Sequence, residues 1–251
     1  MTNISSANSP AESGKPLAGH VALVTGSSRG IGKAISRKLA QLGAALSLCG
    51  RNPLTLEAAS RAVGEFSSRV LATPADVTNP KDIVALVQAT EEKLGPITLL
   101  VNNAGLGNPG FGPVQDKTDS DWDLVLNTNL KSVFLVSRAV VPLMVQRRRG
   151  DIINISSLAG KNVFAGGGLY CASKWGLQGL SGCMAEDLRE YGIRVSVVCP
   201  GSVATEFSGR GPKDPNKVLK AEDVAHAVAL LALQGPQSFI SEVHLRPLFR
   251  P

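Results

Sequence analysis

Short apolar runs alternate with helix-like stretches along most of this sequence, and that alternation constrains the fold more than any other feature. The runs lie at residues 21–24, 45–48, 70–72, 97–101, 152–155 and 195–198, with a last one near Val243. They are almost continuously apolar, which is typical of strands buried on both faces of a parallel sheet. Helical patterns separate them at residues 30–42, 54–66, 82–94, 120–145, 169–191 and 222–233. We predict an α/β fold with a doubly wound, seven-stranded parallel sheet and helices on both faces.

Length and composition indicate a single domain. A chain of 251 residues that is 43% hydrophobic and 18% charged can bury a sizeable core. Residues 1–16 are rich in Ser, Pro, Ala and Asn and lack the apolar block of a secretory signal. We predict a flexible tail over residues 1–16, one domain over residues 17–251 and a cytoplasmic location. No apolar run approaches the roughly 20 residues that a membrane helix needs, so we predict no membrane association.

The net charge of +6 admits two interpretations, a nucleic-acid surface or an enzyme that handles anionic ligands. The one dense basic run, Arg147 to Arg149, lies at a predicted helix end, where cations suit the helix dipole. No aromatic residues interleave with this run, as a base-stacking surface requires. We therefore predict anionic small ligands and no nucleic acid.

Cysteine and histidine spacing gives no sign of a metal site. The four cysteines contain no CxxC pair, and no Cys/His group has metal-ligand spacing. We predict that Cys49, Cys171, Cys183 and Cys199 are buried, reduced thiols. We assign His20, His226 and His244 structural or surface roles, and we predict no bound metal.

A glycine-rich turn directly follows the first predicted strand and precedes the first predicted helix. It comprises Gly26, Ser28, Arg29, Gly30, Ile31 and Gly32, after Thr25. Glycine allows a tight turn and a close approach to a pyrophosphate, and the helix N-terminus offers free N–H groups to the anion. A structural turn also uses glycine, but this placement favours a Rossmann-type dinucleotide site.

The end of the second predicted strand indicates which dinucleotide binds. An NAD site normally places a carboxylate there for the ribose 2′-hydroxyl, whereas this chain has Gly50 followed by Arg51. Together with Arg29, this leaves two guanidinium groups that suit a 2′-phosphate. The alternative is that both arginines only face solvent. We predict NADP(H) as the cofactor.

Further motifs follow in a fixed order. They are Asp76-Val77, the stretch Asn102-Asn103-Ala104-Gly105, then Asn129, Ser157, Tyr170-x-x-x-Lys174, and finally Pro200-Gly201 with Val203 and Thr205. Taken with Gly26-x-x-x-Gly30-x-Gly32, this series resembles the classical short-chain dehydrogenase/reductase family over about residues 17–245.

The resemblance implies a set of functional residues. The expected catalytic residues are Asn129, Ser157, Tyr170 and Lys174. The expected cofactor-binding residues are Gly26, Ser28, Arg29, Gly30, Ile31, Gly32, Arg51, Asp76, Val77, Asn103, Ala104, Gly105, Tyr170, Lys174, Pro200, Gly201, Val203 and Thr205. Within this set, Asp76 is expected at the adenine, Lys174 at the nicotinamide ribose, and the segment from Pro200 to Thr205 around the nicotinamide.

The chemistry of Tyr170 and Lys174 supports that assignment. A spacing of four residues on a helix places both side chains on one face. A free phenol has a pKa of about 10, and a nearby ammonium favours the phenolate and lowers that pKa. Tyr170 could then act as general acid in ketone reduction and as general base in alcohol oxidation, while the cofactor carries the hydride.

For several of the remaining polar residues, the sequence allows two alternative roles. Ser157, at the end of a predicted strand, is preferred over Ser156 as the second donor to the substrate carbonyl because its spacing to Tyr170 fits the family. By resemblance, Asn129 holds a water that connects Lys174 to solvent, although an Asn at a helix turn can simply bond to the backbone. Asn103 serves the cofactor or sets the turn, and Thr25 is expected to stabilise the loop.

These features favour a reductase of ketones or aldehydes, with 3-oxoacyl-acyl-carrier-protein reductases as the nearest class. The positive charge suits an acidic carrier protein. A general carbonyl or alcohol dehydrogenase is the main alternative, and a non-catalytic NADP-binding redox sensor is a weaker one. The loop between Gly201 and Ala221 is short for the family, and the chain end lacks the Gly-Gly common in those reductases. The family pairs the helix at 169–191 between subunits, so we predict a homodimer or homotetramer.

Overall fold

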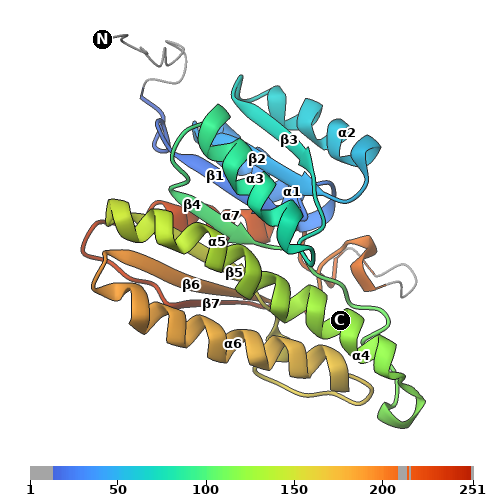
Figure 1. Ribbon diagram of the computed structural model, residues 1–251. Helices are drawn as coiled ribbons and strands as arrows, with labels where there is room; N and C mark the ends of the chain where they lie inside the picture. Colours follow the sequence, from blue (N-terminus) through green and yellow to red (C-terminus); the bar gives the residue numbers. More distant parts are fainter. Residues whose placement is uncertain (1–13, 209–213, 215, 250–251) are drawn as a thin grey trace, which may run out of the picture.

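The computed structural model describes residues 14–208, 214 and 216–249, and these form one seven-stranded sheet flanked by helices (Figure 1). The strands are all parallel, in the order β3-β2-β1-β4-β5-β6-β7. Their bounds are β1 Val21–Thr25, β2 Ala45–Gly50, β3 Val70–Pro74, β4 Leu99–Asn102, β5 Gly150–Ile155, β6 Ile193–Pro200 and β7 Glu242–Leu245. The predicted fold class is confirmed. The predicted tail, residues 1–16, lies mostly outside the described residues.

Helices cover both faces of the sheet, as predicted. One apolar layer joins the sheet to α1 (Gly30–Gln41), α2 (Pro53–Gly64) and α7 (Ala221–Ala232). The other joins it to α3 (Pro80–Lys93), α5 (Ser132–Arg147) and α6 (Gly168–Arg189), which Figure 1 shows in front of the strands. The central strands are buried on both sides, whereas the edge strands β3 and β7 are half-buried because each has only one neighbour.

The strand order reverses at β1, which pairs with β2 on one side and β4 on the other. The chain first builds outward to β3 and then crosses back to continue from β4. In such a sheet the connections on either side of the reversal leave in opposite directions, and a crevice opens at the carboxyl ends of the strands. The topology therefore places the glycine turn, which follows β1, at the mouth of that crevice.

The predicted helix at 120–145 is interrupted by one wider turn. It consists of α4 (Asp119–Leu126), a π-helical turn over Asn127–Lys131 and α5. Such turns insert an extra residue and often occur at functional positions. Asn129, a predicted catalytic residue, lies within it. The whole helix is long and apolar enough to cross a membrane, but Val133, Val136 and Val140 are buried in the core.

Asn-Pro pairs decide where two helices begin. The side chains of Asn52 and Asn79 accept backbone N–H bonds in the first turns of α2 and α3, and Pro53 and Pro80 occupy the first helical positions. An asparagine cap followed by proline favours helix initiation. The apolar pattern alone placed both starts one to two residues too late.

The cysteine prediction holds for three of the four thiols. All four are free, and Cys49, Cys171 and Cys199 are buried. Cys183 is exposed, contrary to the prediction, because it lies on the outer face of α6. The basic run at 147–149 does lie at the end of α5, where Arg147 pairs with Glu91.

Candidate active site

A cleft of about 870 Å³ opens at the carboxyl ends of the strands, around the reversal point at β1. Its volume lies in the range of small-molecule and cofactor sites. Every predicted cofactor residue lines it, from the glycine turn to Thr205, and so does Ser157. Asn129 does not line the cleft; it is fully buried behind the wall.

The glycine turn has a shape that only glycine allows. Gly26 and Gly30 have φ values of +64° and +52°. A Cβ at Gly32 would lie 2.3 Å from the Gly26 carbonyl oxygen, and one at Gly26 would lie 2.9 Å from the Ala104 Cα. The backbone thus passes close to α1 and to the loop after β4. The N-terminus of α1 faces this cleft and offers N–H groups that suit a pyrophosphate.

Thr25 and Asn103 hold the turn in place. The Thr25 hydroxyl oxygen accepts the backbone N–H groups of Asn103 at 2.9 Å and Ala104 at 3.0 Å. The Asn103 side-chain amide donates to the carbonyl oxygens of Thr25 and Gly26 at 2.9 and 3.1 Å. The expectation for Thr25 is confirmed. For Asn103, these bonds show the turn-setting alternative, since both amide hydrogens point to the backbone.

The outer rim of the cleft carries charge. Gly50 ends β2, Arg51 beside it is exposed, and neither residue supplies a carboxylate. Arg29 forms an ion pair with Glu206 at 2.8 Å, and their side chains are 73% and 80% exposed. Sequence reasoning missed Glu206 because it comes from the loop after β6, 177 residues away along the chain.

Tyr170 and Lys174 lie on the inner wall, on one face of α6 as their spacing predicts. They are only 8% and 4% exposed. The Lys174 Nζ lies 5.9 Å from the Tyr170 ring centre and donates to the Ile155 carbonyl oxygen at 2.9 Å. The end of β5 therefore anchors the lysine, while the tyrosine faces the cleft.

Of the two serines after β5, Ser157 is the one next to Tyr170. Its side chain forms a hydrogen bond with the Tyr170 hydroxyl and also accepts the Ala159 N–H at 3.1 Å. The Ser156 hydroxyl is buried and accepts from the Gln178 amide at 3.3 Å. The geometry therefore favours Ser157 as the second donor, in line with the sequence spacing.

Burial is the largest cause of the pKa shifts of Tyr170 and Lys174. Burial raises the pKa of Tyr170 to about 12, although the Ser157 hydrogen bond partly opposes the rise. Burial also lowers the pKa of Lys174 to about 8. The sequence argument expected a lowered pKa for Tyr170, but among the protein's own groups desolvation of the phenolate outweighs any help from the ammonium. Tyr170 is therefore a neutral phenol, the form that can donate a proton.

Hydrogen bonds from the Asn129 side chain hold the loop after β4 in place. Its side-chain oxygen accepts the Leu106 N–H at 2.8 Å, and its amide donates to the Leu106 carbonyl oxygen at 2.9 Å and to the Ser173 hydroxyl at 3.1 Å. These bonds match the backbone-bonding alternative for the side chain. The water relay to Lys174 stays a prediction.

Two aromatic rings contact Tyr170, and a third contacts one of them. The rings of Phe111 and Phe207 lie 5.2 and 6.0 Å from that of Tyr170, and Phe164 lies 6.1 Å from Phe111, measured between ring centres. Sequence reasoning missed all three because they lie on loops without a motif. Of the three, only Phe207 lines the cleft, so it adds apolar surface there beside Tyr170.

Comparisons with known proteins show the family of this chain. The model of the short chain dehydrogenase family matches residues 20–216. The sepiapterin reductase of Chlorobaculum tepidum is 34% identical, over 91% of this chain and 96% of that protein. Nodulation protein G of Rhizobium sp. (strain N33) is 37% identical, over 86% of this chain and 90% of its own. A crystal structure of a metagenomic short-chain oxidoreductase in complex with NADP is 41% identical, with a TM-score of 0.82, and covers 94% of this chain and 100% of its own.

The fold and the site together define an oxidoreductase with a dinucleotide-type cleft. The chain belongs to the short chain dehydrogenase family.

Proposed function

We propose that this chain is an NADP(H)-dependent ketoreductase that uses Tyr170 as its proton donor. One observation carries the proposal: Tyr170, Lys174 and Ser157 meet on one wall of the cleft that the glycine turn and two arginines border. The NADP-bound relative supports the choice of cofactor. The glycine cradle fits a pyrophosphate, and the rim offers Arg29 and Arg51 to a 2′-phosphate.

We propose the following binding roles for the residues that line the cleft. The turn from Gly26 to Gly32 would hold the pyrophosphate, and Asp76 with Val77 would border the adenine. The segment from Pro200 to Thr205 would enclose the nicotinamide, and Lys174 would hold its ribose. When bound, the nicotinamide supplies or accepts the hydride.

The proton steps fall to this chain's own groups. In ketone reduction, the Tyr170 hydroxyl donates its proton to the substrate oxygen while Ser157 donates a hydrogen bond to the same atom. Burial keeps Tyr170 neutral, which suits reduction. In alcohol oxidation Tyr170 must act as base, and this direction needs extra positive charge near the phenol, such as that of the oxidised nicotinamide.

For the substrate we propose 3-oxoacyl groups on an acidic carrier protein as the first candidate. The net charge of +6 suits such a carrier. A second candidate is a free apolar ketone or aldehyde, which the ring of Phe207 favours because it lines the cleft beside Tyr170 and can bury apolar substrate surface.

Subunit association and location belong to the same proposal. On α6, the expected interface helix, Leu177 and Leu188 are buried in the core, whereas Trp175 is half-exposed. Phe134 on the neighbouring α5 is also exposed. We propose that these two aromatic residues contribute to the interface of a homodimer or homotetramer. The cytoplasmic location stays a prediction.

A substrate panel tests the function. Purified protein is incubated with NADPH or NADH and with a 3-oxoacyl carrier protein, the matching small thioester or apolar ketones, while loss of reduced cofactor is recorded. The proposal expects NADPH-dependent reduction and a preference for the carrier-linked substrate. Equal rates for the two thioesters would favour the second candidate. No turnover above that of Tyr170→Phe with any substrate would contradict both.

A further inference from the structure

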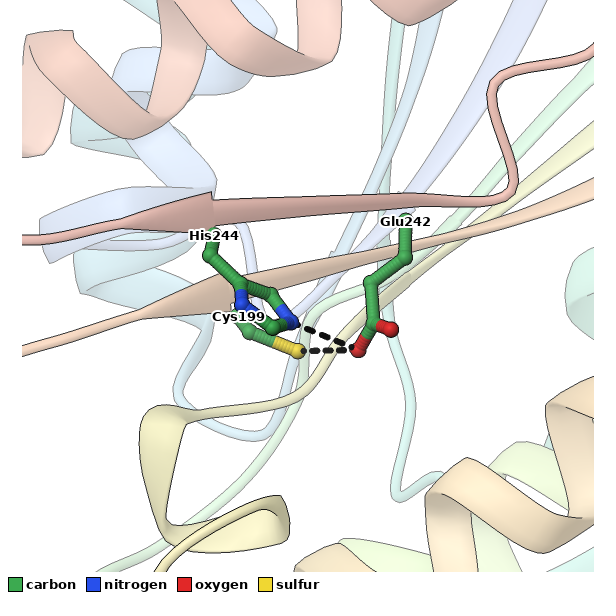
Figure 2. Close-up of side chains that lie close together, drawn as sticks. All are labelled: Cys199, Glu242 and His244. Carbon is green, nitrogen blue, oxygen red and sulfur yellow. Dashed lines mark hydrogen bonds and ion pairs between the residues drawn. The ribbon is translucent and has the colours of Figure 1, made fainter.

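A second polar cluster lies on β6 and β7, outside the catalytic cleft. Figure 2 shows Cys199, Glu242 and His244 pointing toward one another, and their ligand atoms all lie within 4.8 Å of each other. The Cys199 thiol donates to Glu242 Oε1 at 3.2 Å, and the His244 Nε2 lies 3.1 Å from the same oxygen.

Strand register brings these three residues together. Cys199 is paired with His244 in the parallel ladder between β6 and β7, and Glu242 lies two residues before His244. Because side chains alternate between the faces of a strand, all three point to one face. The separation of 43 residues along the chain explains why spacing within the sequence gave no sign of the cluster.

We propose that Cys199, Glu242 and His244 form a binding site for one zinc ion. Thiolate, imidazole and carboxylate are all zinc ligands, and three of them with a water complete a tetrahedral site. Bond lengths of about 2.0 to 2.3 Å imply ligand atoms roughly 3.3 to 3.5 Å apart around a tetrahedral ion. The distances of 3.1 and 3.2 Å about Glu242 Oε1 are close to these values, whereas the ligand atoms of Cys199 and His244, which lie within 4.8 Å of each other, would have to approach by up to about 1.3 Å.

Supporting contacts for such a site are already in place. Lys161 pairs with the other carboxylate oxygen, Glu242 Oε2, at 3.0 Å and leaves Oε1 for the metal. The Gln178 amide donates to the Cys199 sulfur at 2.9 Å, a contact that stabilises a thiolate. Outer contacts of this kind orient metal ligands and tune their charge.

The protonation balance is simple. Cys199 is buried, and both burial and Glu242 raise the pKa of its thiol to about 12, so the thiol is protonated without a metal. Zinc binding replaces the S–H bond with an S–Zn bond, and one proton leaves to solvent. His244 is exposed, so solvent can supply the water ligand on its side of the site.

Direct metal analysis tests the site on the untagged, full-length chain. Reduced protein is stripped with a chelator, incubated with zinc and separated from free metal, and its zinc content is measured by mass spectrometry. We expect about one zinc per chain in the wild type and less than roughly a tenth of that in Cys199→Ser/His244→Gln. The matched control, Cys183→Ser/His226→Gln, alters an exposed cysteine and an exposed histidine and should bind as the wild type does.

Cobalt identifies the ligands even if the double variant folds poorly. Cobalt(II) bound to a thiolate gives an intense charge-transfer absorption, which the wild type should show and Cys199→Ser should lose. His244→Gln changes only a partly exposed side chain, so a folded variant is available, and it should weaken binding at least about 10-fold. A wild type that retains no zinc, or a double variant that retains as much as its control, would overturn the proposal and leave a hydrogen-bonded cluster.

Discussion

The inner wall and the rim of the candidate cleft are built in opposite ways. The inner wall carries Tyr170 and Lys174, which are 8% and 4% exposed and have strongly shifted pKa values. The rim carries Arg29 and Glu206, whose side chains are 73% and 80% exposed. Electrostatic interactions gain strength as water is excluded and are screened where it is not. The inner wall therefore suits proton transfer, and the rim suits the selection of a charged ligand.

The size of the effect expected from a substitution therefore depends on whether the altered residue is buried in the inner wall or exposed at the rim. Changes to the buried pair should alter chemistry or stability by large factors, and changes to the rim should alter cofactor choice by small ones. If a rim substitution removed activity, or an inner-wall substitution had no effect, the inner wall and the rim would not have the separate functions described above.

The largest effect is expected for Tyr170→Phe, which removes the transferable proton and keeps the ring. We expect turnover to fall about 10²-fold or more, the usual size of a general acid contribution. Fluorescence titration should show NADPH affinity close to that of the wild type, because the ring still packs against Phe111 and Phe207. Near-normal turnover would show that another group donates the proton.

Lys174→Met should change how stability depends on pH. Burial lowers the pKa of Lys174 from 10.5 to about 8, so between these values the unfolded chain binds more protons than the folded one. The free energy of unfolding of the wild type should then rise with pH across that window. The shift corresponds to roughly 3 kcal/mol, or about 10² in the folding equilibrium.

Urea unfolding of both proteins at pH 7 and pH 10.5 measures this difference. Contributions from other groups are shared by the two proteins and cancel in the comparison. The wild type should gain stability relative to Lys174→Met as the pH rises. If the free energies of unfolding of the two proteins change with pH in parallel, the pKa of Lys174 is not lowered in the folded protein. By the proposed ribose contact, the same variant should also bind NADPH more weakly, unlike Tyr170→Phe.

The combined change Gly50→Asp and Arg51→Ala should move cofactor preference toward NADH. It supplies a carboxylate for a ribose 2′-hydroxyl and removes one phosphate partner. We expect the ratio of kcat/KM for NADPH over NADH to fall about 10-fold or more, the scale of one charge-assisted hydrogen bond. Arg61→Ala, which alters an exposed arginine paired with Glu57 on α2, serves as the control. A wild type that prefers NADH would contradict the assignment of the rim.

The smallest effect is expected for Glu206→Gln, which frees Arg29 from its ion pair. Exposed pairs contribute at most about 1 kcal/mol, so NADPH binding should tighten by no more than about fivefold. The effect should shrink at high salt. Glu57→Gln, which breaks an exposed pair on α2, should leave the affinity unchanged. Weaker NADPH binding in Glu206→Gln would mean that Glu206 supports the ligand rather than competing for Arg29.

Local sequence patterns predicted the sheet, the helices and the glycine turn because each depends on neighbouring residues. The pair Tyr170 and Lys174 was also accessible, since four residues on a helix fix a shared face. The ion pair of Arg29 with Glu206 and the ring contacts of Tyr170 depend on loops and could not be read from spacing. The sign of the Tyr170 pKa shift failed for a related reason: burial is a property of the whole fold, whereas the sequence showed only the neighbouring lysine.

We propose that this cleft passes a hydride between NADP(H) and a carbonyl, with Tyr170 as the proton donor. The most direct measurement follows deuterium from NADPH labelled at the transferable position of the nicotinamide, with an apolar ketone as acceptor. We predict that mass spectrometry finds one deuterium on the carbinol carbon of the product, formed by the wild type about 10²-fold faster than by Tyr170→Phe. An alcohol product without deuterium, or equal rates for the two proteins, would contradict the account.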